Sequence, residues 1–309
     1  MELARRKQGD PVHGWLVLDK PLGMTSTTAV AVVKRLFNAA KAGHAGTLDP
    51  LATGVLPIAL GEATKTVSFA MDGAKAYRFT VRWGEATDTD DAEGTVIERS
   101  DTRPTRAAIE AALPQFTGTI VQVPPQFSAI KLAGERAYDL ARDGETVDLE
   151  PRTVEVMSLA LVAAPDADHG EFEAECGKGT YVRAIARDLG RILGCFGHVT
   201  ALRRTKVGPF TADRMIPLEK LEALRNKADG REALKEWLLP VETALDDIPA
   251  LAVGSAEAAR LKLGQSVIVR GRDAPLNQES VLIMWRGQPI ALASLSQGAI
   301  KPKRIFNLS

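Results

Sequence analysis

One aspartate, Asp49, stands among small and apolar residues in the stretch GHAGTLDPLATGVLPIALGEATK, residues 43–65. A carboxylate in such surroundings is driven toward its neutral form unless a cation lies nearby, and an arginine partner typically lowers the pKa of an aspartate by about 1–3 units. Candidate cations come from TYVRAIARDLGR, where Arg183, Arg187 and Arg191 are spaced four apart and share one helical face. We expect Arg183, in the first turn, to hold Asp49 ionised as a nucleophile or base. An ordinary Asp-Pro turn is the alternative on these residues alone.

Several familiar catalytic and metal-binding motifs are missing or wrongly spaced. CGKGTY has Gly179 where a P-loop requires Ser or Thr after its lysine. DTDDAEG places its glycine one position late for a calcium loop and lacks the final Glu ligand. No GxSxG nucleophile elbow occurs. Two cysteines outside any CxxC and four scattered histidines make a zinc site an unattractive interpretation.

The chain has 309 residues, 45% hydrophobic and 25% charged, which is typical of a globular protein with two domains. Its net charge is +0, but the signs are segregated: residues 66–175 hold 10 Lys/Arg against 21 Asp/Glu, and residues 176–220 hold 9 against 3. A neutral chain with this pattern can present one basic face to phosphates while its acidic middle faces away. The polar N-terminus lacks the apolar core of a signal peptide, no apolar run could span a membrane, and cysteines are few, so we expect a cytoplasmic protein.

Apolar spacing predicts the elements that must position these residues. Strands are expected near residues 15–18, 77–83, 153–163 and 170–176. An amphipathic helix with Ser26 as its N-cap should end near Gly43, a short helix should cover 104–116, and a clear helix should start after Thr180. Residues 85–94 read as an acidic hairpin loop. The excursion over about 124–152, irregular and then helical near Arg136, suggests a lid.

Beyond residue 245 the composition changes to short strands separated by turn residues. We therefore predict a catalytic domain over 1–245 and a small β-rich domain over 246–309. Strands joined by hairpins and interrupted by helices favour an α/β (α+β) fold, with a mixed, mainly antiparallel sheet flanked by helices.

The sequence resembles the bacterial tRNA pseudouridine-55 synthases, the TruB family, over about residues 11–220. GHAGTLDPLATGVLPIALGEATK is similar to that family's catalytic motif, which contains G-T-L-D-P. LVLDKPLGMTS, KAYRFTVRWGEATDTDDAEG, VPPQFSAIK, KGTYVRAIARDLG and LRRTKVGPF resemble its other motifs in the same order, and KPKRIF resembles the end of a PUA module. Six ordered motifs make this resemblance specific.

The resemblance implies an isomerase that converts a T-loop uridine of tRNA to pseudouridine, with the pseudouridine synthase fold and a C-terminal PUA-like domain. The reaction involves no net redox change, so neither a cofactor nor a metal is expected. Asp49 matches the family's catalytic aspartate, Arg183 the arginine that pairs with it, and Tyr77 the tyrosine that stacks on the flipped-out base and is a candidate for proton transfer. The further positions implied to border the bound nucleotide are His44, Tyr181, Leu202, Lys65 and Lys20.

Contacts to the RNA backbone are expected from the basic segment and from the lid, since flipping a base requires the surrounding strand to be held. The residues expected to make them are Lys131, Arg136, Arg203, Arg204 and Lys206. We expect a monomer that needs no protein partner and does not bind membranes. Two alternatives are a non-catalytic module that binds or folds tRNA, and a guide-RNA-dependent relative of the family.

Overall fold

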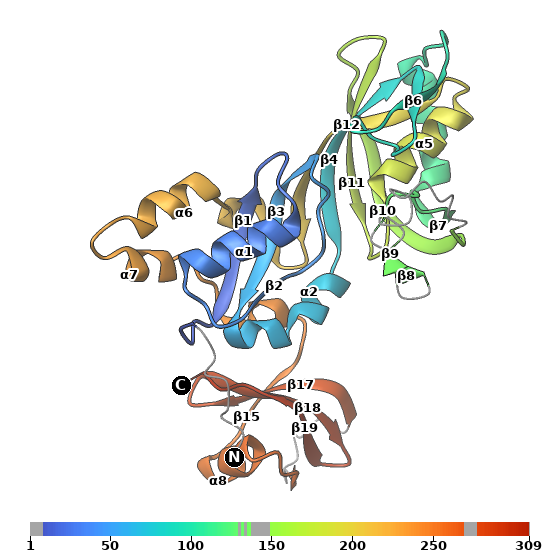
Figure 1. Ribbon diagram of the computed structural model, residues 1–309. Helices are drawn as coiled ribbons and strands as arrows, with labels where there is room; N and C mark the ends of the chain where they lie inside the picture. The colour runs from blue at the N-terminus through green and yellow to red at the C-terminus, as the bar shows by residue number, and fades with distance from the viewer. Residues whose placement is uncertain (1–8, 129–130, 133–134, 137–148, 269–276, 309) are drawn as a thin grey trace.

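The computed structural model describes residues 9–128, 131–132, 135–136, 149–268 and 277–308 (Figure 1). Within these residues a ten-stranded sheet carries the larger part of the chain, and a five-stranded sheet forms a separate layer near the C-terminus. The strands of the large sheet are β1 (Gly14–Lys20), β2 (Ala42–His44), β3 (Ala52–Leu60), β4 (Lys75–Trp83), β7 (Gly118–Gln122), β10 (Arg152–Ala163), β11 (His169–Cys176), β12 (Gly197–Val207), β13 (Phe210–Thr211) and β14 (Ile216–Pro217).

The large sheet runs in the order β14-β1-β3-β12-β4-β11-β10-β7, with β2 beside β3 and β13 beside β12. Its pairs are antiparallel except β1–β14 and β12–β3, so the predicted mixed, mainly antiparallel sheet is confirmed. The acidic hairpin is separate from this sheet, because its strands β5 (Glu85–Thr87) and β6 (Val96–Arg99) pair only with each other in a two-stranded ladder. The expected hairpin with residues 85–94 as its loop is therefore wrong, since Glu85–Thr87 is itself a strand and β4 pairs with β11 and β12.

Helices cover the sheet at both ends (Figure 1). The helices of this part of the chain are α1 (Ser26–Leu36), α2 (Val67–Asp72), α3 (Arg106–Ala112), α5 (Val182–Ile192), α6 (Leu218–Arg225) and α7 (Gly230–Lys235), with short 3-10 turns η1 (Gly61–Lys65), η2 (Leu113–Phe116), η3 (Ala212–Arg214) and η4 (Val241–Leu245). A further helix, α8 (Ser255–Lys262), packs on the C-terminal sheet.

Three helical expectations need correction. α1 ends at Leu36 rather than near Gly43, and its N-cap is Thr25, whose hydroxyl accepts the Thr28 N–H. The expected helix near Arg136 is instead a strand where it is described, since β8 (Lys131–Leu132) pairs with β9 (Glu135–Arg136). Residues 137–148 of the expected lid lie outside the described residues.

Alternating side chains divide the core into two layers. Leu16 and Leu18 of β1 pack toward α1 and the large core, whereas Trp15 and Val17 point to the opposite face. That second face also contains Phe210 and side chains of the C-terminal sheet, so burial of apolar area joins the two sheets. The C-terminal strands are β15 (Ala250–Ala252), β16 (Val267–Ile268), β17 (Asn277–Trp285), β18 (Gln288–Ser296) and β19 (Ala299–Ile305), in the order β15-β17-β18-β19-β16.

Candidate active site

The loop that carries Asp49 connects β2 to β3 and is held on its flank by α1. Ser26 is buried at the start of that helix, where its Oγ accepts the Leu48 N–H at 2.8 Å and donates to the Leu48 carbonyl at 3.0 Å. The Ala52 N–H donates to the Asp49 carbonyl at 3.0 Å and closes a turn over Pro50. The turn uses only the backbone of Asp49, so its carboxylate is available for a partner elsewhere.

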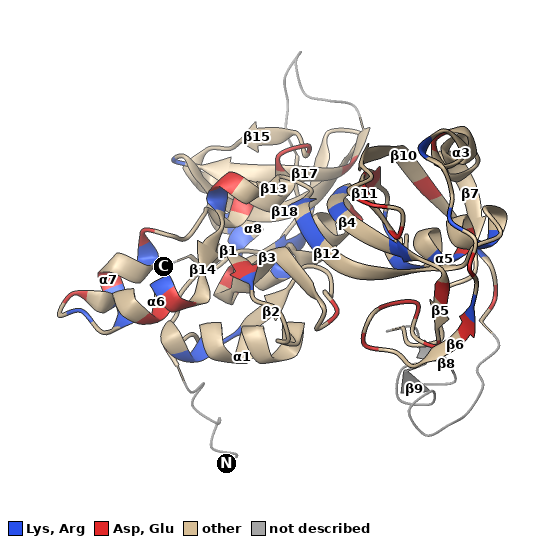
Figure 2. Cartoon of the chain, turned by 90° about the horizontal axis from the view of Figure 1, so that it is seen from above, with Lys and Arg blue, Asp and Glu red and all other residues tan. Residues whose placement is uncertain are grey.

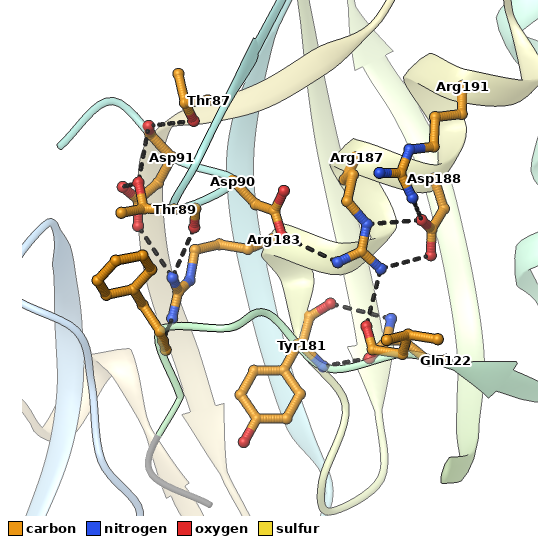
Figure 3. Close-up of polar contacts among 12 residues, drawn as sticks. Thr87, Thr89, Asp90, Asp91, Gln122, Tyr181, Arg183, Arg187, Asp188 and Arg191 are labelled. Atoms are coloured by element: carbon orange, nitrogen blue, oxygen red, sulfur yellow. Dashed lines mark hydrogen bonds and ion pairs between the residues drawn. The ribbon is translucent and has the colours of Figure 1, made fainter. Parts of the chain in front are cut away.

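That partner is Arg183, whose Nη2 lies 2.9 Å from Asp49 Oδ2. The guanidinium also lies 3.3 Å from Asp91 Oδ2 and donates to the carbonyls of Thr89 and Phe127 at 2.8 Å each, as part of this network in Figure 3 shows. With its side chain only 6% exposed and its N–H groups committed on several sides, Arg183 has little rotational freedom. Asp49 itself is 39% exposed, so its surroundings are more open and polar than the sequence suggested.

The acidic loop after β5 faces the arginines of α5 instead of turning away from them. Asp91 is 2% exposed and contacts Arg183, while Asp90 Oδ2 lies 3.0 Å from Nη1 of Arg187 (Figure 3). Arg187 also contacts Asp188, with its Nε 2.8 Å from Asp188 Oδ1. Arg191 lies on the other side of that carboxylate, with its Nη1 3.6 Å from the same oxygen. Asp91 was not predicted from the sequence. The signal was present, because the arginines spaced four apart in one segment and the acidic run in another have opposite charges and could have been paired.

Two cavities meet at the Asp49–Arg183 pair. The first, of about 290 Å³, is lined by the two aromatic side chains Tyr77 and Tyr181, by Leu202, and by Lys178 at its edge. The second, of about 380 Å³, is lined by Thr89, Phe127 and several carboxylates. In the second cavity, burial and the charges of Asp91 and Asp49 raise the pKa of Glu93. The first has the flat, apolar walls that suit a base; the second is strongly acidic.

Three neighbouring elements place the walls of the first cavity. Tyr77 lies on β4 directly opposite Arg204 of β12, and burial raises the pKa of its phenol. Leu202, two residues before Arg204, lies opposite Phe79 and is 9% exposed. Tyr181 precedes α5; its backbone N–H donates to Gln122 at 2.8 Å and its carbonyl accepts from Gln122 at 3.1 Å, and its ring extends away from that contact (Figure 3).

Two of the lysines expected at the nucleotide lie elsewhere. Lys20 is fully buried and donates to the carbonyls of Pro21, Met24 and Pro50, so it holds the Asp49 loop from below. Burial lowers its pKa to about 8. Lys65 contacts Glu62 and donates to the Ile305 carbonyl, both at 2.6 Å, which places it at the junction with the C-terminal sheet. The sequence could not distinguish a structural lysine from one that contacts the nucleotide, because Lys20 and Lys65 both lie within family motifs expected to line the cleft.

His44 is the last residue of β2 and lies opposite Ile58 of β3. It precedes by two residues Gly46, which lines the first cavity. Its contact with a nucleotide stays a prediction. Lys131 and Arg136 face each other in the β8–β9 ladder, but their side chains lie outside the described residues.

The expected phosphate-binding cations of β12 are mostly engaged within the protein. Figure 2 shows Lys and Arg positions gathered along β12 and β4 in the middle of the sheet. Arg203 forms a two-point contact with Asp19 at 3.0 and 2.9 Å, and Lys206 lies 2.9 Å from Glu175. Arg204 is 2% exposed and its guanidinium is bonded within the protein, which argues against its expected contact with the RNA backbone; that contact stays a prediction. Folding brings the acidic middle of the chain against its basic segment, so charge along the sequence overstated the basic face.

Among the described residues, no group of three or more His, Cys, Asp or Glu side chains could hold a metal ion. In the same part of the chain, no helix has both the length and the apolar character needed to cross a membrane.

Comparison with known proteins identifies the family to which this fold belongs. Residues 34–182 match the family model of the TruB family pseudouridylate synthase N-terminal domain, and residues 183–246 match that of the tRNA pseudouridylate synthase B C-terminal domain. A curated relative from Bradyrhizobium diazoefficiens, named tRNA pseudouridine synthase B, is 66% identical over 99% of this chain and 88% of its own length. A relative of the same name from Agrobacterium fabrum is 56% identical over 98% of this chain and 97% of its own.

Solved structures agree. The crystal structure of the archaeal box H/ACA sRNP Nop10-Cbf5 complex superimposes with a TM-score of 0.73 at 25% identity, covering 98% of this chain and 92% of that chain. A mixed sheet with an Asp–Arg pair beside a cavity with aromatic walls, together with these matches, defines a pseudouridylate synthase. Within that class, the chain belongs to the TruB family.

Proposed function

We propose that this protein isomerises the uridine at position 55, in the T-loop of tRNA, to pseudouridine without a cofactor. The observation that carries the proposal is the Asp49–Arg183 pair at the mouth of a cavity of about 290 Å³ lined by Tyr77, Tyr181 and Leu202. The names of the curated relatives support the tRNA substrate. The T-loop position follows from the motif resemblance described above.

In the proposed reaction the N1–C1′ bond of uridine breaks, the uracil turns within the cavity, and a C5–C1′ bond forms. The C5 proton leaves to a base and N1 gains a proton, so atoms and electrons balance without an oxidant or water. Asp49 acts on the ribose as nucleophile or base, and Arg183, 2.9 Å from its carboxylate, holds that group at the cavity. Tyr77 stacks on the base and is suited to relay a proton.

The target base must leave the stacked loop before it can reach Asp49, which costs a few kcal/mol. Stacking on an aromatic side chain recovers about 1–3 kcal/mol per base. Tyr77 supplies that surface, while Leu202 keeps water from the turned uracil. The second cavity, lined by carboxylates, repels phosphates, so we place the ribose-phosphate strand on the side of Lys178 and the uracil in the first cavity.

We further propose that the chain divides near residue 245 and that the C-terminal part is a PUA-like domain that contacts the tRNA. The short β-rich sheet over Ala250–Ile305 supports this division. We expect the enzyme to act as a monomer in the cytoplasm; light scattering at micromolar concentration checks the oligomeric state.

Purified protein is incubated with unmodified T-arm stem-loop RNA carrying tritium at C5 of uridine, and release of tritium is measured. We expect release from the RNA with uridine at position 55 and none when that position is cytidine. Asp49→Asn should bind the RNA within a few-fold of wild type but release no tritium. Normal release by Asp49→Asn would contradict the nucleophile assignment, and binding without turnover by the wild type would favour a module that only binds tRNA.

One structural observation favours a second candidate, a guide-RNA-dependent enzyme, because the H/ACA complex superimposes over almost the whole chain. The identity to the bacterial relatives is much higher, which supports the stand-alone reaction. The same assay separates the two. Turnover of T-arm RNA by the purified chain alone excludes a requirement for a guide RNA. Turnover of T-arm RNA only after a separate guide RNA is added would establish that requirement.

A further inference from the structure

The buried guanidinium of Arg204 connects the two halves of the site. Its Nε donates to the Val55 carbonyl at 2.8 Å, and its Nη2 and Nη1 donate to the carbonyls of Gly46 and Thr47 at 3.1 and 3.3 Å. Val55 belongs to β3, whereas Gly46 and Thr47 begin the loop that ends at Asp49. A single side chain thus fixes the start of the catalytic loop relative to the sheet.

The same guanidinium reaches the other wall of the cavity. Arg204 lies directly opposite Tyr77 in the β12–β4 ladder, so the two side chains share one face of the sheet, and the Arg204 cation opposes the rise that burial causes in the pKa of the Tyr77 phenol. Arginine has five N–H donors in a fixed planar fork, so three bonds to carbonyls leave donors for the phenol. Arg204 therefore contacts both the loop of Asp49 and the ring proposed to stack on the uracil.

Burying this charge is costly, which makes its position informative. Arg204 is 2% exposed, and no carboxylate forms an ion pair with it among the described residues. Its charge is compensated by carbonyls, by the phenol of Tyr77 and by the attraction of Asp49, which is not in ion-pair contact, and such a buried charge is expensive for a fold to retain. The strands also approach closely at this point: Gly54, opposite Arg204 on β3, has φ +96°, and a Cβ there would lie 2.2 Å from the backbone carbonyl of Arg204.

We propose that Arg204 is a positioning residue that sets the distance between the phenol of Tyr77 and the carboxylate of Asp49 during isomerisation. The inference rests on the proposed function and deepens it. Arg204 lies in the wall of the same cavity, but its N–H groups are bonded to carbonyls, so in this proposal it acts through the two groups that contact the substrate. Loss of this side chain should therefore lower kcat while leaving the affinity for tRNA nearly unchanged, since small misplacements of reacting groups are costly.

The experiment compares Arg204→Met, Arg204→Lys and the control Arg78→Met in the tritium-release assay. Arg78, next to Tyr77 in sequence but 54% exposed and 3.4 Å from Glu173, loses a charge without touching the loop. We expect Arg204→Met to lower kcat by about tenfold or more, with the tRNA Kd within about threefold. Arg204→Lys, which keeps the charge but not the fork, should lose less, and Arg78→Met should stay within about twofold of wild type. A folded Arg204→Met with the kcat of the wild type would overturn the proposal, as would a loss confined to the Kd.

A second measurement does not depend on turnover. In a Tyr138→Phe/Tyr181→Phe background Tyr77 is the only tyrosine, so its phenol is titrated by ultraviolet absorbance. Because the Arg204 cation opposes the rise in the pKa of Tyr77, Arg204→Met should raise that pKa further, and an unchanged titration would contradict the contact.

If the wild type makes no product, the proposed function fails while this titration still tests the contact. If Arg204→Met does not fold, a double-mutant cycle of Arg204→Lys with Tyr77→Phe decides, with coupling below about twofold overturning the proposal.

Discussion

Arg183 lies between Asp49 and Asp91, with its guanidinium 2.9 Å from one carboxylate and 3.3 Å from the other. The two acids come from different loops, and only one of them, Asp49, borders both cavities. Arg183 therefore compensates the charge of the proposed nucleophile. It also links Asp49 to the acidic loop between β5 and β6, which carries Asp91.

Arg183→Lys should lower kcat by about 10²-fold, because an ammonium keeps the charge but cannot bind both carboxylates and both carbonyls at once. Single-turnover kinetics on T-arm RNA measure the chemical step, and filter binding measures affinity. Affinity within a few-fold of wild type is the expected control. A single-turnover rate equal to that of the wild type would show that the fork geometry is not needed.

Asp91→Asn should lower the free energy of unfolding by about 2 kcal/mol or more, because it removes one partner of a buried pair. Asp91 also accepts from the Thr89 hydroxyl at 2.6 Å and from the Glu93 N–H at 3.0 Å, so an amide cannot satisfy the same set. Asp188→Asn is the matched control: its partners are Arg187 and Arg191, and at 31% exposure its loss should cost no more than about 0.5 kcal/mol. Urea titrations give both values, and equal costs would contradict a special role for the buried pair.

Lys178→Ala should weaken tRNA binding a few-fold and reduce the slope of log affinity against log salt by about 1. Lys178 lines the aromatic cavity and is 72% exposed. Within the part of the chain that the structure describes, its ion pair is with Asp72 at 2.9 Å, a surface partner that it can exchange for a phosphate. Lys235→Ala on α7 is the control, since Lys235 is also a surface lysine, 2.8 Å from Glu232. Binding measured across a salt series would argue against the phosphate contact if both variants kept the slope of the wild type.

The buried Lys20 predicts a particular pH dependence of stability. Burial lowers its pKa to about 8 from 10.5, so the folded state disfavours the ammonium. The resulting penalty is fully present below pH 8 and is relieved as pH rises toward 10.5, because only the unfolded chain still binds the proton in that window. The free energy of unfolding of the wild type should therefore rise relative to Lys20→Met between pH 8 and 10.5, by up to about 3 kcal/mol. A constant difference in urea titrations across that range would show that the pKa of Lys20 is not lowered.

Much of the fold followed from local patterns in the sequence. The alternation of Phe79, Val81 and Trp83 predicted β4, and the apolar spacing of Val182, Ile185 and Leu189 predicted α5. Ile192, which completes the same spacing, is the last residue of the helix and is 52% exposed. The approach of Asp49 to Arg183 was also predictable, since an isolated carboxylate needs a cation and the helix offered one.

The roles of the other cations were not predictable from type and spacing. Arg203 and Arg204 are neighbours in a strand, so they point to opposite faces, and the sequence does not say which face is buried. One binds Asp19 near the surface and the other lies beneath the catalytic loop. Lys65 was equally ambiguous, because its partner Ile305 comes from the far end of the chain.

The parallel pairing of β3 with β12 joins distant parts of the chain, with Leu202 opposite Ala52, and the Arg204 side chain reinforces it by bonding the Val55 carbonyl, 149 positions away. A ribosome adding about 5–20 residues per second therefore needs many seconds after making Asp49 to deliver the strand that braces it. During that interval β3 has an unsatisfied edge toward the missing strand. Catalytic competence thus arrives late in synthesis, and truncated chains that stop before β12 should be inert and prone to aggregate.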